Sequence, residues 1–127
     1  MTSSFSSNAE SEAERLTCRL AWEHLGIQND KLKSLSRNGM LDRIFWIPGG
    51  KPLLIEFKLP GEDPRPNQKD IHDELRNLGY DAQVHDNAAD AFQAIIEAVE
   101  PACVSKTSRK ILARARRCCA VLRSRSG

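Results

Sequence analysis

The sequence of residues 42–58 is Asp-Arg-Ile-Phe-Trp-Ile-Pro-Gly-Gly-Lys-Pro-Leu-Leu-Ile-Glu-Phe-Lys. It contains two short apolar runs joined by Pro-Gly-Gly, a composition typical of a β-hairpin. Both runs are apolar on either face, as expected for strands in the middle of a covered sheet. Residues 42–47 and 52–58 are therefore predicted to be neighbouring antiparallel strands.

The turn between these strands sets their register. In a three-residue loop, Pro48 starts a type I turn and Gly50 takes the left-handed conformation, which places Asp42 opposite Glu56. A two-residue loop would instead place Arg43 opposite Glu56 and turn Asp42 to the other face of the sheet. The sequence leaves both registers open.

The first register would bring three charged side chains together. Glu56 and Lys58 stand two positions apart, so they point to the same side of a strand, and Asp42 would face them. Two carboxylates and an ammonium group can hold a divalent metal and stabilise a phosphate during hydrolysis. The alternative is an exposed charge pair beside a turn residue. The apolar neighbours Ile55 and Phe57 argue against exposure, because a buried charge is costly without a partner.

The rest of the chain predicts further elements around this hairpin. Apolar periodicity and turn residues predict a helix over 11–25, a weak strand over 31–36, a helix over 66–78, a strand over 80–85 and a helix over 87–99. Asp86 or Asn87 can cap the last of these helices. The order αβββαβα predicts an α/β fold with a mixed central sheet flanked by helices.

Composition limits the class of protein. The chain has 127 residues, of which 40% are hydrophobic and 28% charged, as expected of one folded domain. No apolar run approaches the roughly 20 residues of a membrane helix, and the polar start does not resemble a signal peptide. We therefore expect a cytoplasmic protein of a bacterial cell or a phage-infected host. The four cysteines and three histidines lack the local spacing of a zinc site, which predicts reduced thiols.

Charge is distributed unevenly along the chain. The first 100 residues hold 11 basic and 17 acidic residues, whereas residues 101–127 hold 8 basic residues and no acid. Such a basic segment suggests a polyanionic partner, and a solvated tail is the alternative. From Thr107 the segment can form a last helix that docks on the body or on a second subunit, with one narrow apolar face comprising Ile111, Ala115, Cys118 and Leu122.

Taken together, the motifs resemble those of a known family. They comprise Asn-Gly-Met-Leu-Asp-Arg at 38–43, Pro-Gly-Gly-Lys at 48–51, Ile-Glu-Phe-Lys-Leu-Pro-Gly at 55–61 and Pro-Asn-Gln at 66–68. In order and spacing over residues 12–98, they resemble the VRR-NUC nucleases of the PD-(D/E)xK superfamily, which have a restriction-endonuclease-like fold. Leu41 departs from that pattern, since the family usually has proline there. The resemblance implies a nuclease domain over 11–101, after a flexible N-terminus over 1–10 and before a basic C-terminal tail over 102–127.

The resemblance also implies roles for individual residues. Asp42 and Glu56 correspond to the metal-binding carboxylates, and the main-chain carbonyl of Phe57 to a further ligand. Mg²⁺ or Mn²⁺ suits such an all-oxygen site. Lys58 would orient or help deprotonate the attacking water, or offset charge in the transition state. Gln68 would position water or phosphate.

Two further sets of residues are assigned more loosely. Glu14 matches the family's N-terminal glutamate, as an outer or second-metal ligand, although Glu10, Glu12 and Glu23 compete for that role. The residues Arg43, Arg65 and Lys69 flank the site in sequence and are candidate phosphate contacts. For all three histidines, His24, His72 and His85, a structural or solvated role is the expectation.

The predicted function is that of a Mg²⁺- or Mn²⁺-dependent endonuclease acting on DNA. The stand-alone members that the chain resembles are similar to enzymes that resolve Holliday junctions, so the resemblance implies branched DNA substrates and a homodimer. We expect no small-molecule cofactor and no membrane partner. Two alternatives stay open: a flap or other structure-specific nuclease acting as a monomer or in a complex, and a non-catalytic nucleic-acid-binding module.

Overall fold

The structure is a computed structural model, and it describes residues 5–32, 42–63 and 66–126. The elements, in chain order, are α1 (Phe5–Leu25), β1 (Asn29–Lys31), β2 (Arg43–Phe45), β3 (Leu53–Phe57), α2 (Pro66–Asn77), β4 (Asp81–His85), α3 (Ala88–Val99), the short 3₁₀ helix η1 (Glu100–Ala102) and α4 (Lys106–Ser126).

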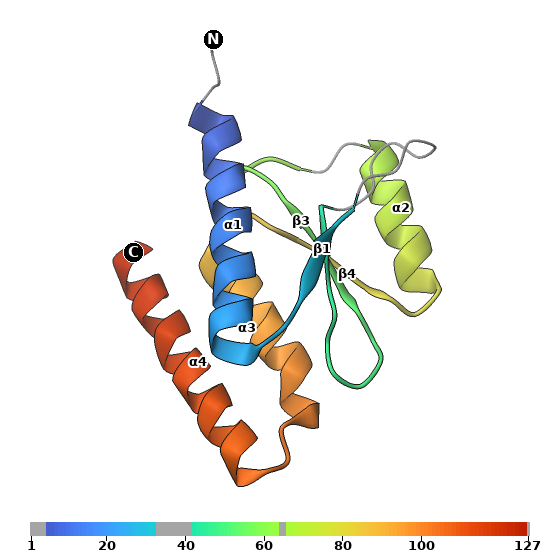
Figure 1. Ribbon diagram of the computed structural model, residues 1–127. Helices are drawn as coiled ribbons and strands as arrows, with labels where there is room; N and C mark the ends of the chain where they lie inside the picture. Colours follow the sequence, from blue (N-terminus) through green and yellow to red (C-terminus); the bar gives the residue numbers. More distant parts are fainter. Residues whose placement is uncertain (1–4, 33–41, 64–65, 127) are drawn as a thin grey trace.

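The four strands form one mixed sheet in the order β1-β2-β3-β4. The first three strands are antiparallel neighbours, and β4 pairs with β3 in parallel. In Figure 1, α1 and α3 lie on one side of the sheet and α2 on the other. The predicted α/β architecture is therefore confirmed, including the mixed sheet and the order of its elements.

The register of the β2–β3 hairpin agrees with the three-residue loop. Arg43 pairs with Ile55, and extending this register by one residue places Asp42 opposite Glu56. The predicted turn type is wrong, however. Gly49 has φ +105°, which suits the third position of a type II turn and not that of a type I turn. Because Gly49 is followed by Gly50, both residues can adopt positive φ angles. The loop keeps three residues, so the register is the same.

The two faces of the sheet have different cores. The face toward α1 and α3 contributes an apolar cluster from the strands and the residues beside them, namely Phe45, Ile47, Leu53, Ile55 and Phe57. The face toward α2 packs Leu54 and Ala82 against Ile71 of α2, with Ile44 at the margin. Because side chains alternate along β3, residues 53, 55 and 57 belong to the first face and residues 54 and 56 to the second.

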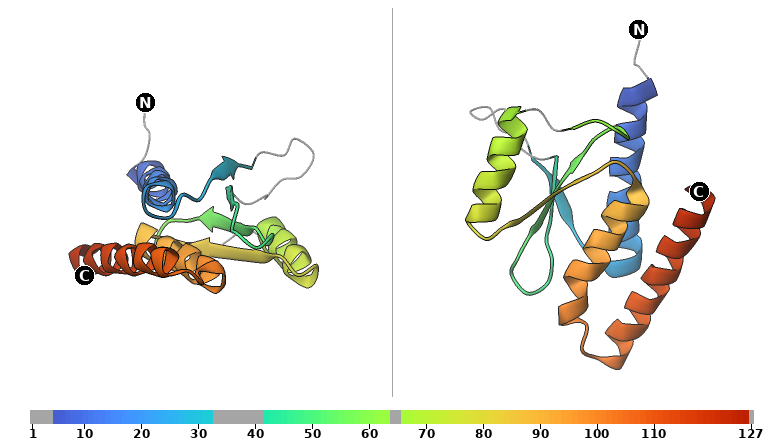
Figure 2. Two further views of the ribbon diagram at one scale, coloured as in Figure 1. Left: turned by 60° about the horizontal axis from the view of Figure 1, so that its bottom comes forward. Right: turned by 180° about the vertical axis from the view of Figure 1, so that it is seen from behind.

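Helix α4 adds an outer layer on α1 and α3, as two views of the molecule show (Figure 2). Its buried side chains Leu112, Ala115 and Cys119 form one apolar cluster with Phe92 and Ile96 of α3. Three residues of the predicted apolar face, Ala115, Cys118 and Leu122, belong to this cluster or pack against it, whereas the fourth, Ile111, is 44% exposed. The predicted apolar face was narrow, so the sequence did not determine which residues at its edges would pack against the body.

Two elements differ in extent from the prediction. Helix α1 begins at Phe5 and not at residue 11, because a helix extends through a polar segment at small cost once it is nucleated. Strand β1 covers Asn29–Lys31, and most of the predicted strand at 31–36 lies outside the described residues. Asn87 caps α3 by accepting a hydrogen bond from the Asp90 N–H, as one of the two predicted caps. No helix in the described ranges is long and apolar enough to span a membrane.

Candidate active site

Glu56 is the centre of the site. It lies on β3 with 1% of its surface exposed, on the face of the sheet covered by α2. Its Oε1 is 2.8 Å from His72 Nε2, and its Oε2 is 3.1 Å from Lys58 Nζ. The Lys58 contact has the distance but not the geometry of a hydrogen bond, so Oε2 has no hydrogen-bond partner among the described residues. This buried carboxylate oxygen therefore has the Lys58 ammonium nearby but keeps hydrogen-bonding or ligating capacity that no described residue uses.

His72 is the residue that sequence reasoning missed. It projects from α2 onto the sheet with only 2% exposure, and its ring nitrogen contacts Glu56 directly. The expectation of a structural or solvated histidine did not anticipate this contact. A signal was present, however, because His72 follows Gln68 by four residues and therefore shares its helix face. The face of α2 that carries Gln68 thus also holds the partner of Glu56.

Asp42 is fixed immediately before β2 by three hydrogen bonds. Its N–H donates to the Ile55 carbonyl at 3.1 Å, and its own carbonyl accepts from the Leu32 N–H at 2.9 Å. Its Oδ2 accepts from the Phe57 N–H at 2.7 Å. The Asp42 carboxylate therefore lies against the main chain that links Glu56 to Phe57, as the first register requires.

The carboxyl of Asp42 is destabilised in its charged form. Burial raises its pKa, and the Phe57 N–H opposes this effect. The negative charges of Glu14 and Glu56 raise the pKa further, although Lys31 counteracts them. A cation bound nearby would relieve both the burial and the repulsion.

Glu14 lies on α1 beside this group, but one of its carboxylate oxygens is already engaged by two cations. Its Oε2 accepts from Arg43 Nε at 2.5 Å and from Lys31 Nζ at 2.9 Å. Burial acts to raise its pKa, yet the hydrogen bonds from Lys31 and Arg43 outweigh it and lower the pKa below the ordinary value. Arg43 also donates to Asn29 Oδ1 at 3.0 Å, so its guanidinium is used inside the protein.

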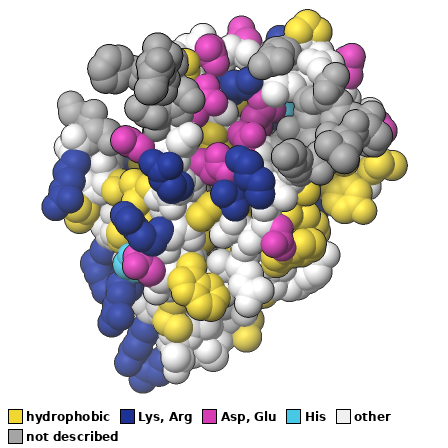
Figure 3. Space-filling model, turned by 45° about the horizontal axis from the view of Figure 1, so that its top comes forward, with side chains coloured by type: hydrophobic (Ala, Val, Ile, Leu, Met, Phe, Trp, Pro, Cys, Tyr) yellow, Lys and Arg dark blue, Asp and Glu magenta, His cyan; other side chains and the backbone are white. Residues whose placement is uncertain are grey.

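Glu10, one turn earlier on α1, faces the charges of the site. Burial raises its pKa, and so do the charges of Glu62, Asp42 and Glu56, whereas Lys58 lowers it. In the sequence this residue appeared only as a competitor of Glu14. Acidic side chains gather near the centre of the face in Figure 3, with basic side chains beside them. The site thus has a surplus of carboxylates around Lys58.

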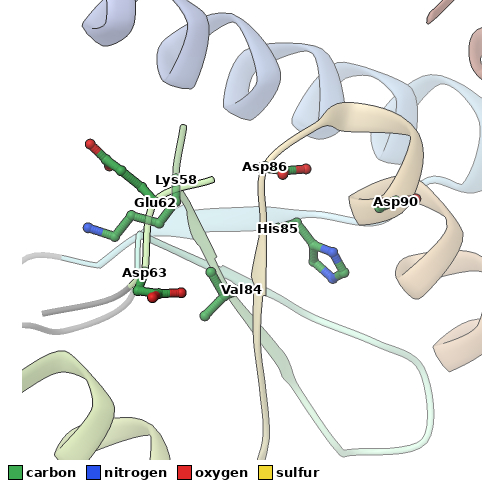
Figure 4. A pocket seen from close by; sticks show the side chains of 7 residues that line it. All are labelled: Lys58, Glu62, Asp63, Val84, His85, Asp86 and Asp90. Atoms are coloured by element: carbon green, nitrogen blue, oxygen red, sulfur yellow. The ribbon is translucent and has the colours of Figure 1, made fainter. Parts of the chain in front are cut away.

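A hollow of about 390 Å³ opens beside Lys58. It is lined by Lys58, Glu62, Asp63, Val84, His85, Asp86 and Asp90. Figure 4 shows Lys58, Glu62 and Asp63 on one side of this hollow and His85 and Asp90 on the other. Burial lowers the pKa of His85. The hollow gives the Lys58 ammonium group access to solvent, and it is lined by four acids.

The donors present fit a hard divalent cation. In the described ranges, no three Asp, Glu, His or Cys side chains converge as a ready-made metal site. The predicted set is different, with two carboxylates and the Phe57 main-chain carbonyl, all of them oxygen donors. The buried Oε2 of Glu56, which has no hydrogen-bond partner among the described residues, and the disfavoured charge of Asp42 fit such an ion.

The other predicted residues are placed as follows. Gln68 is half-buried in the first turn of α2, and Lys69 is exposed beside it. Lys69 lines a smaller hollow of about 250 Å³ together with His72. Arg65 lies outside the described residues. The structure brings Asp42, Glu56 and Lys58 together, whereas the roles of Gln68, Lys69 and Arg65 stay predictions.

Comparison with solved structures identifies the fold. The chain superimposes on a structure described as a VRR_NUC domain with a TM-score of 0.61 and 24% identity, covering 68% of this chain and 94% of the other. A second structure, a VRR_NUC domain protein, matches with a TM-score of 0.59 and 19% identity, covering 72% and 88%. The chain therefore has the restriction-endonuclease-like fold of VRR_NUC domains.

Comparison of sequences gives one informative match. The chain is 40% identical over 57 residues to "Putative nuclease p44" of Acyrthosiphon pisum secondary endosymbiont phage 1, which corresponds to 45% of this chain. The matched region spans 61% of the length of that curated relative. No protein-family model matches the chain. The resemblance to VRR-NUC nucleases seen in the sequence is thus supported by the fold and by a phage relative.

Proposed function

We propose that this chain is a metal-dependent nuclease of the VRR-NUC type that hydrolyses phosphodiester bonds of DNA. The observation that carries the proposal is the state of Glu56, a carboxylate with 1% exposure whose Oε2 has no hydrogen-bond partner among the described residues. This oxygen forms an ion pair with Lys58 Nζ at 3.1 Å that lacks hydrogen-bond geometry, so Oε2 keeps lone pairs that a metal ion could accept. The VRR_NUC fold and the phage relative support the same class of activity.

Asp42, Glu56 and the Phe57 carbonyl would hold Mg²⁺ or Mn²⁺. The bound ion would polarise the scissile phosphate and lower the pKa of a coordinated water. The chain's own residues then have separate tasks. His72 holds Oε1 of Glu56, so that Oε2 would be the oxygen to bind the ion, and the Phe57 N–H fixes the carboxylate of Asp42.

Lys58 would act on the reacting water and phosphate. Its Nζ lies 3.1 Å from Glu56 Oε2, and its side chain is 12% exposed at the edge of the hollow. From there the ammonium group can offset negative charge that develops on the phosphate. Gln68, from the first turn of α2, would orient the water or a phosphate oxygen.

The preferred substrate that we propose is branched DNA, cut by a homodimer. One chain carries one such site, so symmetric cleavage of two strands needs two copies related by a two-fold axis. A flap nuclease that acts as a monomer is the competing proposal. These two proposals differ in the stoichiometry of the active species and in the substrate cut.

The test uses purified full-length protein with labelled four-way junction, flap and linear duplex DNA, each with Mg²⁺, Mn²⁺ or EDTA. We expect cleavage of the junction with either metal and none in EDTA. Cleavage that persists in EDTA would contradict metal dependence, and cleavage of the flap alone would favour the monomeric alternative. Binding of DNA without cleavage under any metal would indicate a non-catalytic module. Light scattering of the free and DNA-bound protein decides the stoichiometry.

A further inference from the structure

Helix α4 carries a basic surface that the proposed active site does not use. Residues 101–127 contain no acid, and α4 contributes all eight basic residues after Glu100. The two comparison structures cover 68% and 72% of the chain, so part of the chain has no counterpart in them. The packing and charge of α4 itself indicate what this helix can bind.

Two of its arginines are already neutralised within the fold. Arg116 forms an ion pair with Glu100 at 2.9 Å, and Arg123 with Asp90 at 2.8 Å. Both acids belong to α3 or directly follow it, so these two arginines attach α4 to the body. They leave a larger set unpaired. Six exposed basic side chains of α4 make no ion pair with any described residue: Lys106, Arg109, Lys110, Arg114, Arg117 and Arg125.

The unpaired cations form a stripe that faces away from the protein. Lys110, Arg114 and Arg117 are spaced by four and three residues, so they share one face of the helix. That face is opposite the one through which Leu112 and Cys119 are buried. Basic side chains line the left edge of the molecule in Figure 3, where α4 runs in Figure 1.

The packing of α4 decides between the possible anionic partners. A basic amphipathic helix binds a membrane by inserting its apolar face. In α4 that face is occupied, because Leu112, Ala115 and Cys119 pack on α1 and α3. What remains outside is an arginine-rich surface with few apolar side chains, which suits the regular phosphates of a nucleic-acid backbone.

The position of α4 connects it to the candidate site. Arg123, near its C-terminal end, binds Asp90, and Asp90 lines the same hollow as Lys58. A 21-residue helix is roughly 30 Å long, which corresponds to about nine phosphates along one strand of a duplex. The C-terminal part of α4 thus lies beside the hollow next to the site, and the stripe lies earlier on the same helix.

We infer that the outer face of α4, centred on Lys110, Arg114 and Arg117, binds the phosphate backbone of the duplex that flanks the cleavage site. This inference rests on the proposed function and deepens it, because it assigns the surface that holds the DNA. The contact is independent of sequence, since it involves phosphates and not base edges.

The test measures binding of full-length protein to a 30-base-pair duplex in EDTA, by fluorescence anisotropy over a series of salt concentrations. The triple variant Lys110→Gln, Arg114→Gln, Arg117→Gln is compared with the wild type. A plot of log K against log salt has a negative slope, and loss of three phosphate contacts should make that slope shallower by roughly 2 to 3. Near 0.1 M salt, the affinity should fall by at least about tenfold.

Two controls separate a phosphate contact from other effects. The variant Lys110→Arg, Arg114→Lys, Arg117→Lys keeps every charge and should bind within about threefold of the wild type. The change Lys51→Gln, in the hairpin turn, removes one exposed charge elsewhere and is matched to Arg117→Gln. An unchanged slope in the triple variant, or equal losses from these two single changes, would overturn the inference.

Nuclease activity, measured in parallel, keeps this inference apart from the proposed function. If the wild type cleaves DNA but the slope of the triple variant is unchanged, the inference fails and the proposed function stands. If nothing is cleaved under any metal but the slope falls, α4 is a nucleic-acid surface on a protein that is not a nuclease. If the triple variant instead changes only the oligomeric state, as seen by light scattering, the face binds a second copy and the inference is wrong.

Discussion

The two faces of the central sheet differ in what they bury. Toward α1 and α3, β3 presents Leu53, Ile55 and Phe57, and all contacts are apolar. Toward α2, the same strand presents Leu54 and then Glu56, which is as buried as its neighbours. In the five consecutive buried residues of β3, the odd-numbered side chains belong to an apolar core, and the even-numbered Glu56 belongs to the charged site.

Because alternate side chains of a strand point to opposite faces, β3 places residues of the apolar core on one face and residues of the candidate site on the other. A charge at position 53, 55 or 57 of β3 would lie in the apolar cluster and would be costly there. On the other face, α2 supplies His72 and the residue directly after β3 is Lys58, so the Glu56 carboxylate is tolerated. Substitutions at adjacent positions of β3 should therefore affect different properties.

The largest effect is expected for Glu56→Gln. The amide keeps the volume of the side chain but removes a metal-binding charge, so cleavage should fall on the order of 10³-fold or more. The core toward α1 and α3 is untouched, and cooperative unfolding should persist. Steady-state cleavage assays and thermal unfolding measure the two properties. If Glu56→Gln kept its activity, the face of β3 toward α2 would not carry the catalytic site.

Ile55→Ala should show the opposite pattern. Ile55 is 0% exposed in the apolar core, so its truncation should lower the free energy of unfolding by about 2–5 kcal/mol. Urea denaturation measures this loss. Cleavage per folded molecule should stay within about tenfold of the wild type, because the side chain points away from the site. Equal loss of activity in both variants would show that the two faces are not independent.

His72→Phe tests the support of Glu56 from α2. Phenylalanine fills the buried volume but cannot hydrogen-bond to Oε1, so activity should fall by about 10–100-fold. The metal concentration for half-maximal activity should rise as well, which a purely structural defect would not cause. The variant His72→Gln, which can still donate, should recover part of the loss. His24→Gln, on α1, is the control and should leave the metal dependence unchanged.

The smallest effect is expected for Glu14→Gln, and the size of this effect depends on pH. Its pKa is lowered in the folded protein, so the stabilisation by Arg43 and Lys31 is fully present above its unfolded value of 4.5 and is lost as pH falls through the folded pKa. Glu14→Gln should therefore lower the free energy of unfolding by about 1.5 kcal/mol at pH 7 and by much less in strong acid.

The same variant tests whether Glu14 belongs to the site. Because its Oε2 is held by two cations, we expect Glu14→Gln to lower cleavage at pH 7 by less than about tenfold. A loss as large as that of Glu56→Gln would make Glu14 a direct ligand. Glu10→Gln in parallel shows which of the two α1 acids the reaction needs.

The hairpin made much of this fold predictable. Two apolar runs around Pro-Gly-Gly allowed only two registers, and the observed register, with Arg43 opposite Ile55, follows from one of them. Glu56 and Lys58 were found because a strand with alternating faces fixes where i and i+2 side chains point. The type of turn was not predictable, since two glycines permit several conformations with positive φ.

Contacts between distant elements were harder to predict. The contact of His72 with Glu56 depends on how α2 crosses the sheet, and local periodicity contains no such information. The acids of α1 are another example, because Glu10 and Glu14 share one helix face and only packing separates their surroundings. For α4, a helix with cations on most sides allowed more than one buried face.

The docking of α4 has a consequence for the entropy of association. Leu112, Ala115 and Cys119 share one cluster with Phe92 and Ile96, so α4 cannot detach without exposing a core to water. A disordered basic tail would lose backbone freedom when it meets a partner, at about 1–2 kcal/mol for each residue ordered. Here that loss has already occurred on folding. Any partner of α4 therefore meets a preorganised row of charges.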